Sequence, residues 1–393
     1  MEDIVIVAAT RTAVGKFGGS LAKVAAPDLG AIVIKNLLER TGVAADQIGE
    51  VILGQVLAAG SGQNPARQSL MKSGVAQETP ALTINAVCGS GLKAVMLAAQ
   101  AVAWGDSEIV IAGGQENMTL APHLLETSRS GYRMGPTQMT DSMIKDGLWD
   151  PYNNFHMGNA AEICVKEHNF TREEQDAFAI QSYERSANAW EAGKFDNEIV
   201  PVAVPQRKGE PVIVSKDEEY TNVKLDRISS LNPAFTKEGT VTAANASTIN
   251  DGAAALVIMS EKKAKALGLS PLAYILSYAD AAQEPKWFTT SPALALPKAL
   301  KKANLTIEDV DYFEFNEAFS VVGLANAKIL NIDQNKINVN GGAVSLGHPL
   351  GCSGARIIVT LINVLKQNNA TLGAAGICNG GGGASAMVVE LVG

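Results

Sequence analysis

Two stretches of this chain repeat one pattern, and this repeat restricts the possible folds more than any other feature. Residues 37–56 and 299–319 align with an offset of 262, which pairs Asp46 with Glu308. In both copies the pattern indicates the end of a helix, a short loop and a buried strand. Because this spacing is too long for a solenoid unit, it predicts a duplicated domain with two related halves.

A second pair of segments extends the repeat. Ser90 in NAVCGSGLKAVML aligns with Ser353 in HPLGCSGARIIVT at an offset of 263. After each serine, apolar residues recur at i, i+3, i+4 and i+7, which predicts a helix with one buried face. Each helix then leads into a short apolar strand followed by glycines. We therefore expect β-α-β units of an α/β layer fold, with an active site where the halves meet.

The residues between the two halves differ from both in composition. Scattered charges, Met, Tyr, Gly and Pro fill this part of the chain, as in SRSGYRMGPTQMTDSM and VPQRKGEPVIVSKDEEY. Such a composition is typical of an inserted, loop-rich domain. We expect an N-terminal half at residues 1–117 and 250–270, a loop domain at 118–249 and a C-terminal half at 271–393.

Composition argues against several function classes. The net charge is −8 and 18% of the residues are charged, which gives no electrostatic footprint for nucleic acid or an anionic membrane. The start, MEDIVIVAATRT, lacks the features of a signal or transit peptide, and no uninterrupted apolar stretch is long enough to span a membrane. This predicts a cytoplasmic protein, or an organellar one if a transit peptide has been removed. The four cysteines form no C-x-x-C pair, so we expect reduced thiols and no structural zinc.

Cys88 lies in TINAVCGSGLKA, directly before Gly-Ser-Gly and a predicted helix. The N–H groups and dipole at a helix start favour an anion, which would lower the pKa of the thiol and make it a nucleophile. The neighbouring glycines would let a substrate approach the backbone closely. The alternative is a small buried cysteine at a tight turn, and this motif alone leaves both interpretations open.

Three further residues could work with Cys88. His348, in GHPLGCSGAR, aligns with Asn85 of the first copy. If the two halves are related by a twofold axis, this histidine would lie near the thiol and could activate it as a base. The alternative is that His348 is only a turn residue. Cys378 ends a predicted buried strand before a glycine run, which suits a base beside an oxyanion site better than a phosphate loop. Asn316 follows a buried apolar run as either a working amide or a helix cap.

The elements VCGSGLKA, NEAF, GHPLGCSGAR and CNGGGG, in this order, resemble those of the thiolases over essentially the whole chain. Further matches are GGQENM, FHMG, PQRKG and TVTAANAST, and the resemblance is strongest to the acetoacetyl-CoA thiolases. It implies a thiolase fold in which duplicated α/β halves form a layered α-β-α-β-α sandwich, with an inserted loop domain for coenzyme A and oligomer contacts. It also implies a homotetramer built as a dimer of dimers, without a tightly bound cofactor.

The resemblance implies the activity of an acetyl-CoA C-acetyltransferase. Two acetyl-CoA molecules would condense reversibly to acetoacetyl-CoA plus coenzyme A through an acetyl-Cys88 intermediate. His348 would activate Cys88, and Cys378 would move the α-proton of the second acetyl-CoA. Asn316, through a water molecule, and His348 would form one oxyanion hole, and the N–H groups of Cys88 and Gly380 would form another.

Coenzyme A contacts follow from the same resemblance. His156 and the apolar residues would line the pantetheine channel, while Lys224 and Arg227 would supply charge for phosphate groups. The implied contacts are Leu148, His156, Met157, Tyr183, Lys224, Arg227, Phe235, Ala243, Ser247, Ala318 and Phe319. As in the mitochondrial-type subgroup, potassium would be bound by Tyr183, Ala243, Ala244, Ala246 and Val344, since carbonyl oxygens suit a hard cation.

Other interpretations remain. A broader 3-ketoacyl-CoA thiolase of fatty-acid β-oxidation would cleave longer chains, whereas FHMG favours short ones. A ketoacyl synthase shares the fold but uses two histidines, and Cys378 occupies the second position. A non-catalytic thiolase-like acyl-CoA or lipid binder would need a broken motif, and all four are intact. Phe288 goes with acceptance of 2-methylacetoacetyl-CoA in the mitochondrial-type subgroup.

Overall fold

The computed structural model describes residues 3–392, so residues 1, 2 and 393, at the ends of the two predicted halves, lie outside the described residues. The strands of its main sheet assembly are β1 (Ile4–Arg11), β2 (Gly15–Lys16), β3 (Glu50–Gly54), β4 (Ala81–Ile84), β5 (Ile109–Asn117), β12 (Asn250–Ser260), β13 (Ala273–Ala282), β14 (Tyr312–Phe315), β15 (Leu372–Asn379) and β16 (Gly383–Leu391). Their order is β14-β15-β16-β13-β1-β12-β5-β3-β4, with β2 paired to β12. The two halves join where β1 pairs with β13.

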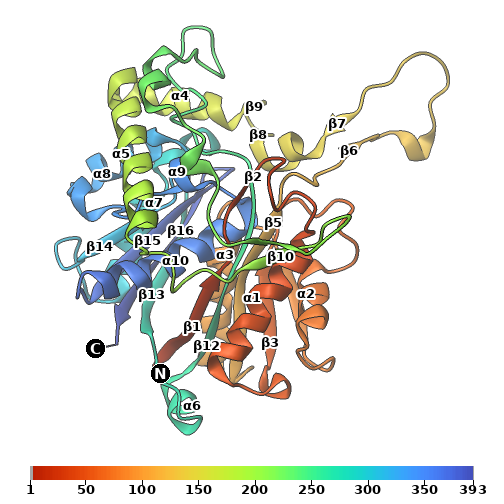
Figure 1. Cartoon of the computed structure of the whole chain (residues 1–393). Coiled ribbons are helices and arrows are strands. Elements are labelled where there is room, and N and C mark those ends of the chain that lie inside the picture. The colour runs from red at the N-terminus through yellow and green to blue at the C-terminus, as the bar shows by residue number, and fades with distance from the viewer. Residues whose placement is uncertain (1–2, 393) are drawn as a thin grey trace.

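The main helices of the sandwich are α1 (Ala26–Thr41), α2 (Pro65–Ser73), α3 (Ser90–Trp104), α7 (Pro292–Lys302), α8 (Ser320–Leu330) and α10 (Leu350–Gln367). α3 and α10 pack on each other and on strands of both halves, so they form a shared middle layer (Figure 1). Alternate residues of each strand face different cores: Val110 and Ala112 face α3 and α10, whereas Ile109 and Ile111 face α1. With α7 packed on the outer face of the second half, this gives the predicted α-β-α-β-α sandwich.

The internal repeat is visible in the topology. The parallel pair β3·β5 with α3 corresponds to the parallel pair β14·β15 with α10. One expectation about these helices was wrong. α10 is buried on almost every side, not on one face, because it lies between the two sheets.

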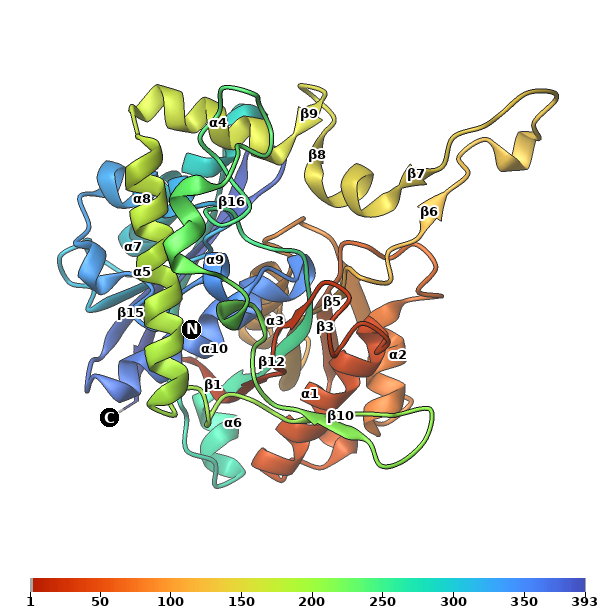
Figure 2. The same ribbon diagram turned by 45° about the horizontal axis from the view of Figure 1, so that its top comes forward.

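The insert between the halves contains more regular structure than a loop-rich domain suggests. Its elements are β6 (His123–Leu124), β7 (Thr140–Asp141), a π-helical turn (Met143–Leu148), β8 (Trp149–Asp150), β9 (Phe155–His156), α4 (Met157–His168), α5 (Arg172–Glu191), β10 (Val202–Val204) and β11 (Val212–Val214). α5 is longer than any other helix of the described residues, and Thr171 and Glu174 form a capping box at its start. The segment that carries β6 and β7 projects from the body as an arm (Figures 1 and 2).

The remaining helices are short. They are α6 (Glu261–Ala266), α9 (Ala343–Leu346) and the 3-10 turns Ala45–Gln47, Ser128–Ser130, Glu219–Thr221, Leu225–Ser230, Pro285–Thr290 and Gln334–Lys336. Among the described residues, Val87–Trp104 alone combines the length and apolar character of a membrane span, and 61% of it is buried. This segment contains α3, so its apolar character belongs to the middle layer of the sandwich.

A buried ion-pair cluster anchors the insert to the first half. Arg11 of β1 contacts Glu198 Oε1 through Nε at 2.6 Å and donates two further hydrogen bonds to the carboxylate of Asp217. Its guanidinium also lies over the ring of Phe195. Because buried charges are stable only when paired and hydrogen-bonded, this cluster fixes the insert against the end of β1, a central strand of the sheet.

Candidate active site

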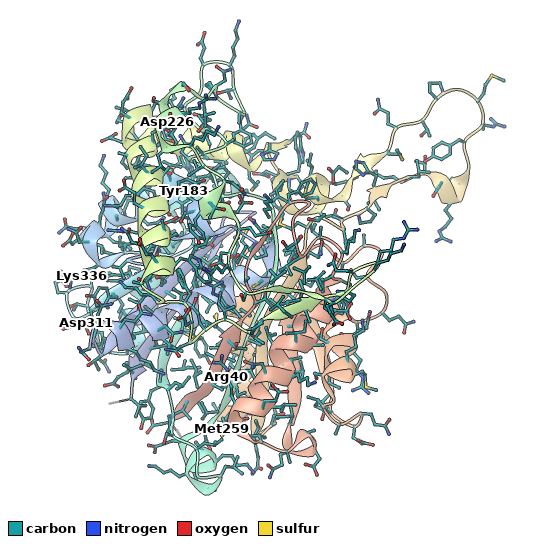
Figure 3. The ribbon with its side chains drawn as sticks, viewed as in Figure 1. Arg40, Tyr183, Asp226, Met259, Asp311 and Lys336 are labelled. Atoms are coloured by element: carbon teal, nitrogen blue, oxygen red, sulfur yellow. The ribbon has the colours of Figure 1, made fainter. Side chains whose placement is uncertain are left out.

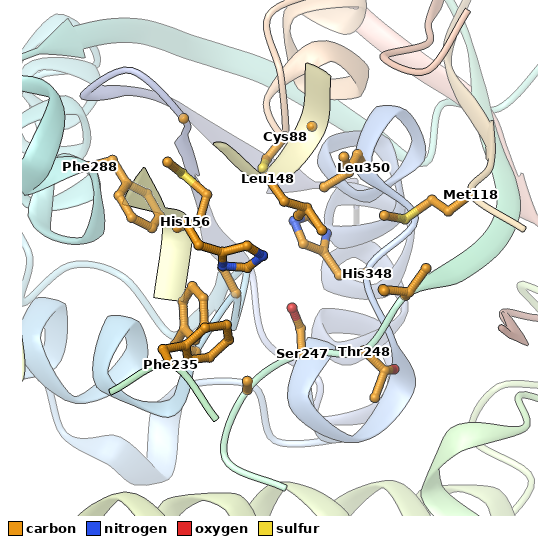
Figure 4. A pocket seen from close by; sticks show the side chains of 17 residues that line it. Cys88, Met118, Leu148, His156, Phe235, Ser247, Thr248, Phe288, His348 and Leu350 are labelled. Atoms are coloured by element: carbon orange, nitrogen blue, oxygen red, sulfur yellow. The ribbon is translucent and has the colours of Figure 1, made fainter. Parts of the chain in front are cut away.

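A cavity of about 230 Å³ lies where the two halves and the insert meet (Figure 4). Cys88 comes from the first half, and His348 and Gly380 come from the second. The predicted coenzyme A contacts that line it are Leu148, His156, Met157, Phe235, Ser247, Ala318 and Phe319. The site therefore lies between the halves, as the repeat predicts, and its wall is mostly apolar.

A strained turn presents Cys88 to this cavity. Val87 has φ 51°, and every other described non-glycine residue with positive φ is an asparagine. A β-branched residue in this region is strained, so the surrounding contacts must hold it there. They do so through Ser90, whose hydroxyl accepts a hydrogen bond from Ala86 N–H and donates one to the carbonyl of Val87. Gly89 follows because a side chain there would collide with Asn379.

The Cys88 thiol is neutral in this structure, which corrects the expectation of a lowered pKa. Burial raises its pKa to about 11, although hydrogen bonds from the main-chain N–H groups of Gly380 and of Cys88 itself oppose that rise. The residue is only 8% exposed. Proximity to the start of α3 does not outweigh the loss of water around the sulfur. A thiolate at this position therefore requires a nearby group that accepts the proton.

His348 lines the same cavity and is neutral, so it can accept a proton. It is 4% exposed, and burial lowers its pKa to about 3, with a further contribution from Arg356. Its Nδ1 lies 2.6 Å from Ser353 Oγ, and that hydroxyl donates to the carbonyl of Pro349. Because the serine hydrogen is already used, Nδ1 carries the imidazole proton and Nε2 is the accepting nitrogen, which faces the Asn316 amide.

Asn316 and Cys378 lie behind the cavity wall. Asn316 Nδ2 is 3.3 Å from His348 Nε2, and its buried Oδ1 has no protein partner. The helix-cap alternative for Asn316 is wrong, since α8 begins only at Ser320. Cys378 is fully buried near the end of β15, where burial and the neighbouring Cys88 raise its pKa well above the usual value. It is thus protonated.

A second cavity, of about 310 Å³, holds the remaining predicted coenzyme A contacts: Tyr183, Lys224, Arg227 and Ala243. Thr248 lines both cavities, so they adjoin. Lys224 and Arg227 are exposed at its rim. Tyr183 of α5 (Figure 3) packs with Ala244 and Val344, and Ala246 lines the first cavity. Of the five residues predicted to bind potassium, Tyr183, Ala243 and Ala244 therefore line the second cavity and Ala246 the first, whereas Val344 lines neither.

Sequence reasoning missed several residues that line the first cavity or support it. Leu350 and Met118 line it, and they lie in the quoted motifs GHPLGCSGAR and GGQENM, but neither was given a role. Ser353 orients His348, but the sequence draws attention to it only because it aligns with Ser90 of the first copy. Glu116 lies in the quoted motif GGQENM, but its role gives no local signal, because its partners Val56 and Gly351 are distant in the chain.

Comparison with known proteins agrees with this geometry. The family "Thiolase, N-terminal domain" matches residues 4–262, and "Thiolase, C-terminal domain" matches residues 269–391. An acetyl-CoA acetyltransferase of Cupriavidus necator is 58% identical over 391 residues, covering 99% of this chain and 100% of the relative. One of Chromobacterium violaceum is 56% identical and covers 99% of both chains.

Solved structures are similar over the full length. A thiolase from Ascaris suum, crystallised in complex with coenzyme A, superposes with a TM-score of 0.95 at 44% identity, covering 100% of both chains. An acetyl-CoA acetyltransferase from Bacillus anthracis gives a TM-score of 0.97 at 41% identity, covering 100% of this chain and 99% of the other. The duplicated sandwich, the cysteine and histidine at its centre and these matches lead to one conclusion: the chain belongs to the thiolase family.

Proposed function

We propose that this thiolase is an acetyl-CoA acetyltransferase. It interconverts two acetyl-CoA with acetoacetyl-CoA plus coenzyme A. The observation that carries the proposal is the meeting of a buried Cys88 thiol, a neutral His348 and two main-chain N–H groups in one apolar cavity. This set matches the requirements of acyl transfer to a thiol.

In the direction of thiolysis, the Cys88 sulfur attacks the keto carbonyl of acetoacetyl-CoA while His348 Nε2 takes the thiol proton. The N–H groups of Cys88 and Gly380 already point at the sulfur, so they are close to the oxyanion that forms on the attacked carbonyl. The carbon–carbon bond then breaks, leaving acetyl-Cys88 and the enolate of acetyl-CoA. Cys378, which is protonated, donates its proton to that enolate carbon.

Coenzyme A completes the cycle. Its thiol gives a proton to the Cys378 thiolate, and its sulfur attacks acetyl-Cys88 to form the second acetyl-CoA. The departing Cys88 thiolate takes back the proton held by His348. All three side chains return to the neutral forms found in the structure. Condensation follows the same steps in reverse.

The test is the coenzyme A-dependent loss of acetoacetyl-CoA absorbance with purified protein and with a Cys88→Ala variant. Rapid loss with the wild type, and none with the variant, supports the proposal. A long-chain 3-ketoacyl-CoA serves as the second substrate, because faster cleavage of it would favour the broader thiolase instead. Binding of acetyl-CoA without turnover of either substrate would identify a non-catalytic binder.

A potassium site is also part of the proposal. Ala244 is buried, and among residues 3–392 no hydrogen bond ends on its main-chain oxygen. Burial raises the pKa of the neighbouring Tyr183, and the carboxylates of Glu219 and Glu317 raise it further, so acidic groups that suit a cation lie close by. Equal turnover in sodium and potassium salts would contradict the site.

For assembly and location we propose a cytoplasmic homotetramer. The arm exposes apolar side chains, with Met134 98% and Met139 65% accessible, and such side chains are typical of contact surfaces. Light scattering of the wild type and of a variant shortened between residues 125 and 139 tests this. A wild-type monomer would contradict it, whereas a tetramer that dissociates when the arm is shortened supports it.

A further inference from the structure

Glu116 is a buried carboxylate that the proposed chemistry does not use. It is the penultimate residue of β5, opposite Gly252 of β12, and its exposed fraction is 0%. Among the described residues it has no cationic partner. Instead, its oxygens accept three main-chain hydrogen bonds, from Leu57 N–H at 3.1 Å, Val56 N–H at 2.9 Å and Gly351 N–H at 2.8 Å.

These three bonds cross the boundary between the halves. Val56 and Leu57 follow β3 in the first half, whereas Gly351 is the second residue of α10 in the second half. The first N–H groups of a helix have no partner within it, and an anion there is favoured by the helix dipole. The carboxylate of the first half therefore caps the helix of the second half.

This cap lies next to the catalytic histidine. His348 precedes Gly351 by three residues, and Leu350 between them lines the cavity. The His348 main-chain N–H is held by Asn250 Oδ1 at 2.7 Å, again from a strand of the first half. Because Cys88 belongs to the first half and His348 to the second, the distance between nucleophile and base depends on such bonds across the boundary.

We propose that Glu116 is a positioning residue for the reaction: its carboxylate holds the first turn of α10, and with it His348, at the working distance from Cys88. The inference rests on the function proposed above. Burial disfavours the charged form of Glu116 and raises its pKa to about 7, although three N–H groups donate hydrogen bonds to the carboxylate. The charged or titratable groups that face it are Asp251 of β12 and the thiols of Cys88 and Cys352.

The test compares Glu116→Gln with a matched control, Asp251→Asn. The glutamine keeps the size of the side chain but turns an NH₂ group toward N–H donors, so at least one hydrogen bond is lost. Asp251 is a neighbouring buried carboxylate that accepts hydrogen bonds from Thr119, and among the described residues it forms no hydrogen bond with α10. Single-turnover acetylation of Cys88 by acetyl-CoA, followed by mass spectrometry, reports the nucleophile and base directly.

For Glu116→Gln we expect acetylation slower by roughly 10- to 100-fold, the cost of a displaced catalytic group, while KM for acetoacetyl-CoA stays nearly unchanged. Asp251→Asn should acetylate at close to the wild-type rate. A wild-type rate in Glu116→Gln, or an equal loss in both variants, would overturn the positioning role.

If Glu116→Gln does not fold, Glu116→Asp takes its place, because it keeps the charge but is too short to bridge the two halves. A wild-type acetylation rate in folded Glu116→Asp would likewise overturn the inference. If the wild-type protein itself is not acetylated, the proposed function fails and the positioning role fails with it. If the wild type is acetylated and the glutamine variant is equally fast, only the positioning role fails.

Discussion

Replacing Arg11 with methionine tests how the insert is anchored to the sandwich. Arg11 is 1% exposed and binds two buried carboxylates, Glu198 and Asp217, at 2.6 to 2.9 Å. Removing one partner of a buried ion pair costs about 3 to 5 kcal/mol, because the remaining charge stays buried without compensation. For a chain of 393 residues the entropy of unfolding is about 0.8 kcal/mol/K, so Tm should fall by roughly 4 to 6 °C.

The loss should also depend on pH. Burial raises the pKa of Glu198 above its usual value, and Arg11 opposes that rise. Without Arg11 the pKa of Glu198 in the folded state rises further. At pH values between the pKa of Glu198 in the unfolded chain and its pKa in the folded variant, the folded variant therefore binds more protons. Its stability therefore falls as pH increases, and the difference in Tm from the wild type should be larger at pH 8 than at pH 5.5.

Thermal unfolding at fixed scan rate and protein concentration measures both effects. Lys72→Met serves as the control, since it breaks an exposed ion pair with Asp28 and should shift Tm by less than about 1 °C. Adding Glu198→Gln and Asp217→Asn to Arg11→Met should recover most of the stability. A Tm unchanged by Arg11→Met, or an unchanged difference between the two pH values, would refute the argument.

Three further substitutions test the site. In a His348→Asn variant, alkylation of Cys88 by iodoacetamide should become about tenfold faster with each pH unit from pH 7 to 9. The reason is that a thiol pKa of about 11 keeps the thiolate fraction small over this range. An alkylation rate that stops rising near neutral pH would contradict this. Val87→Gly should change the free energy of unfolding by less than about 1 kcal/mol in chemical denaturation, since relief of strain offsets added chain entropy, yet kcat should fall as the turn loosens. Phe235→Ala should raise KM for acetoacetyl-CoA about tenfold with little change in kcat, because the ring lines the cavity and stacks on His156 at 4.8 Å; an unchanged KM would exclude that contact.

Much of the fold could be predicted because each copy of the repeat is a short pattern that can be read directly from the sequence. The repeat places corresponding helices and strands at a constant offset, and the structure has them at β3, α3 and β5 and again at β14, α10 and β15. The all-round burial of α10 could not be predicted in this way. Its sequence includes Arg356 and Thr360, which break an apolar pattern, and their burial depends on partners from distant segments such as Glu314 and Glu198.

In the site, too, some features could be predicted from the sequence and others depend on the folded structure. The types and spacing of Cys88, His348 and Cys378 identify candidates for nucleophile and base, because thiols and imidazoles are few in this chain. The protonation state of Cys88 was predicted with the wrong sign, since a helix start is visible in sequence but the depth of burial is not. Glu116 was missed for a similar reason, as its partners come together only in the folded chain.

These features together describe a site that carries little charge at rest. A thiol with a pKa near 11 and an imidazole with a pKa near 3 do not form an ion pair, so the proton stays on Cys88 until the substrate carbonyl is attacked. In an apolar cavity an ion pair at rest would be expensive, whereas charge that appears only on the reacting oxygen meets N–H groups already in place. Reactivity in such a site depends on placement more than on a lowered thiol pKa. The strained turn at Val87 positions the thiol of the first half, and the Glu116 cap, also from the first half, holds the helix start that carries the histidine of the second half.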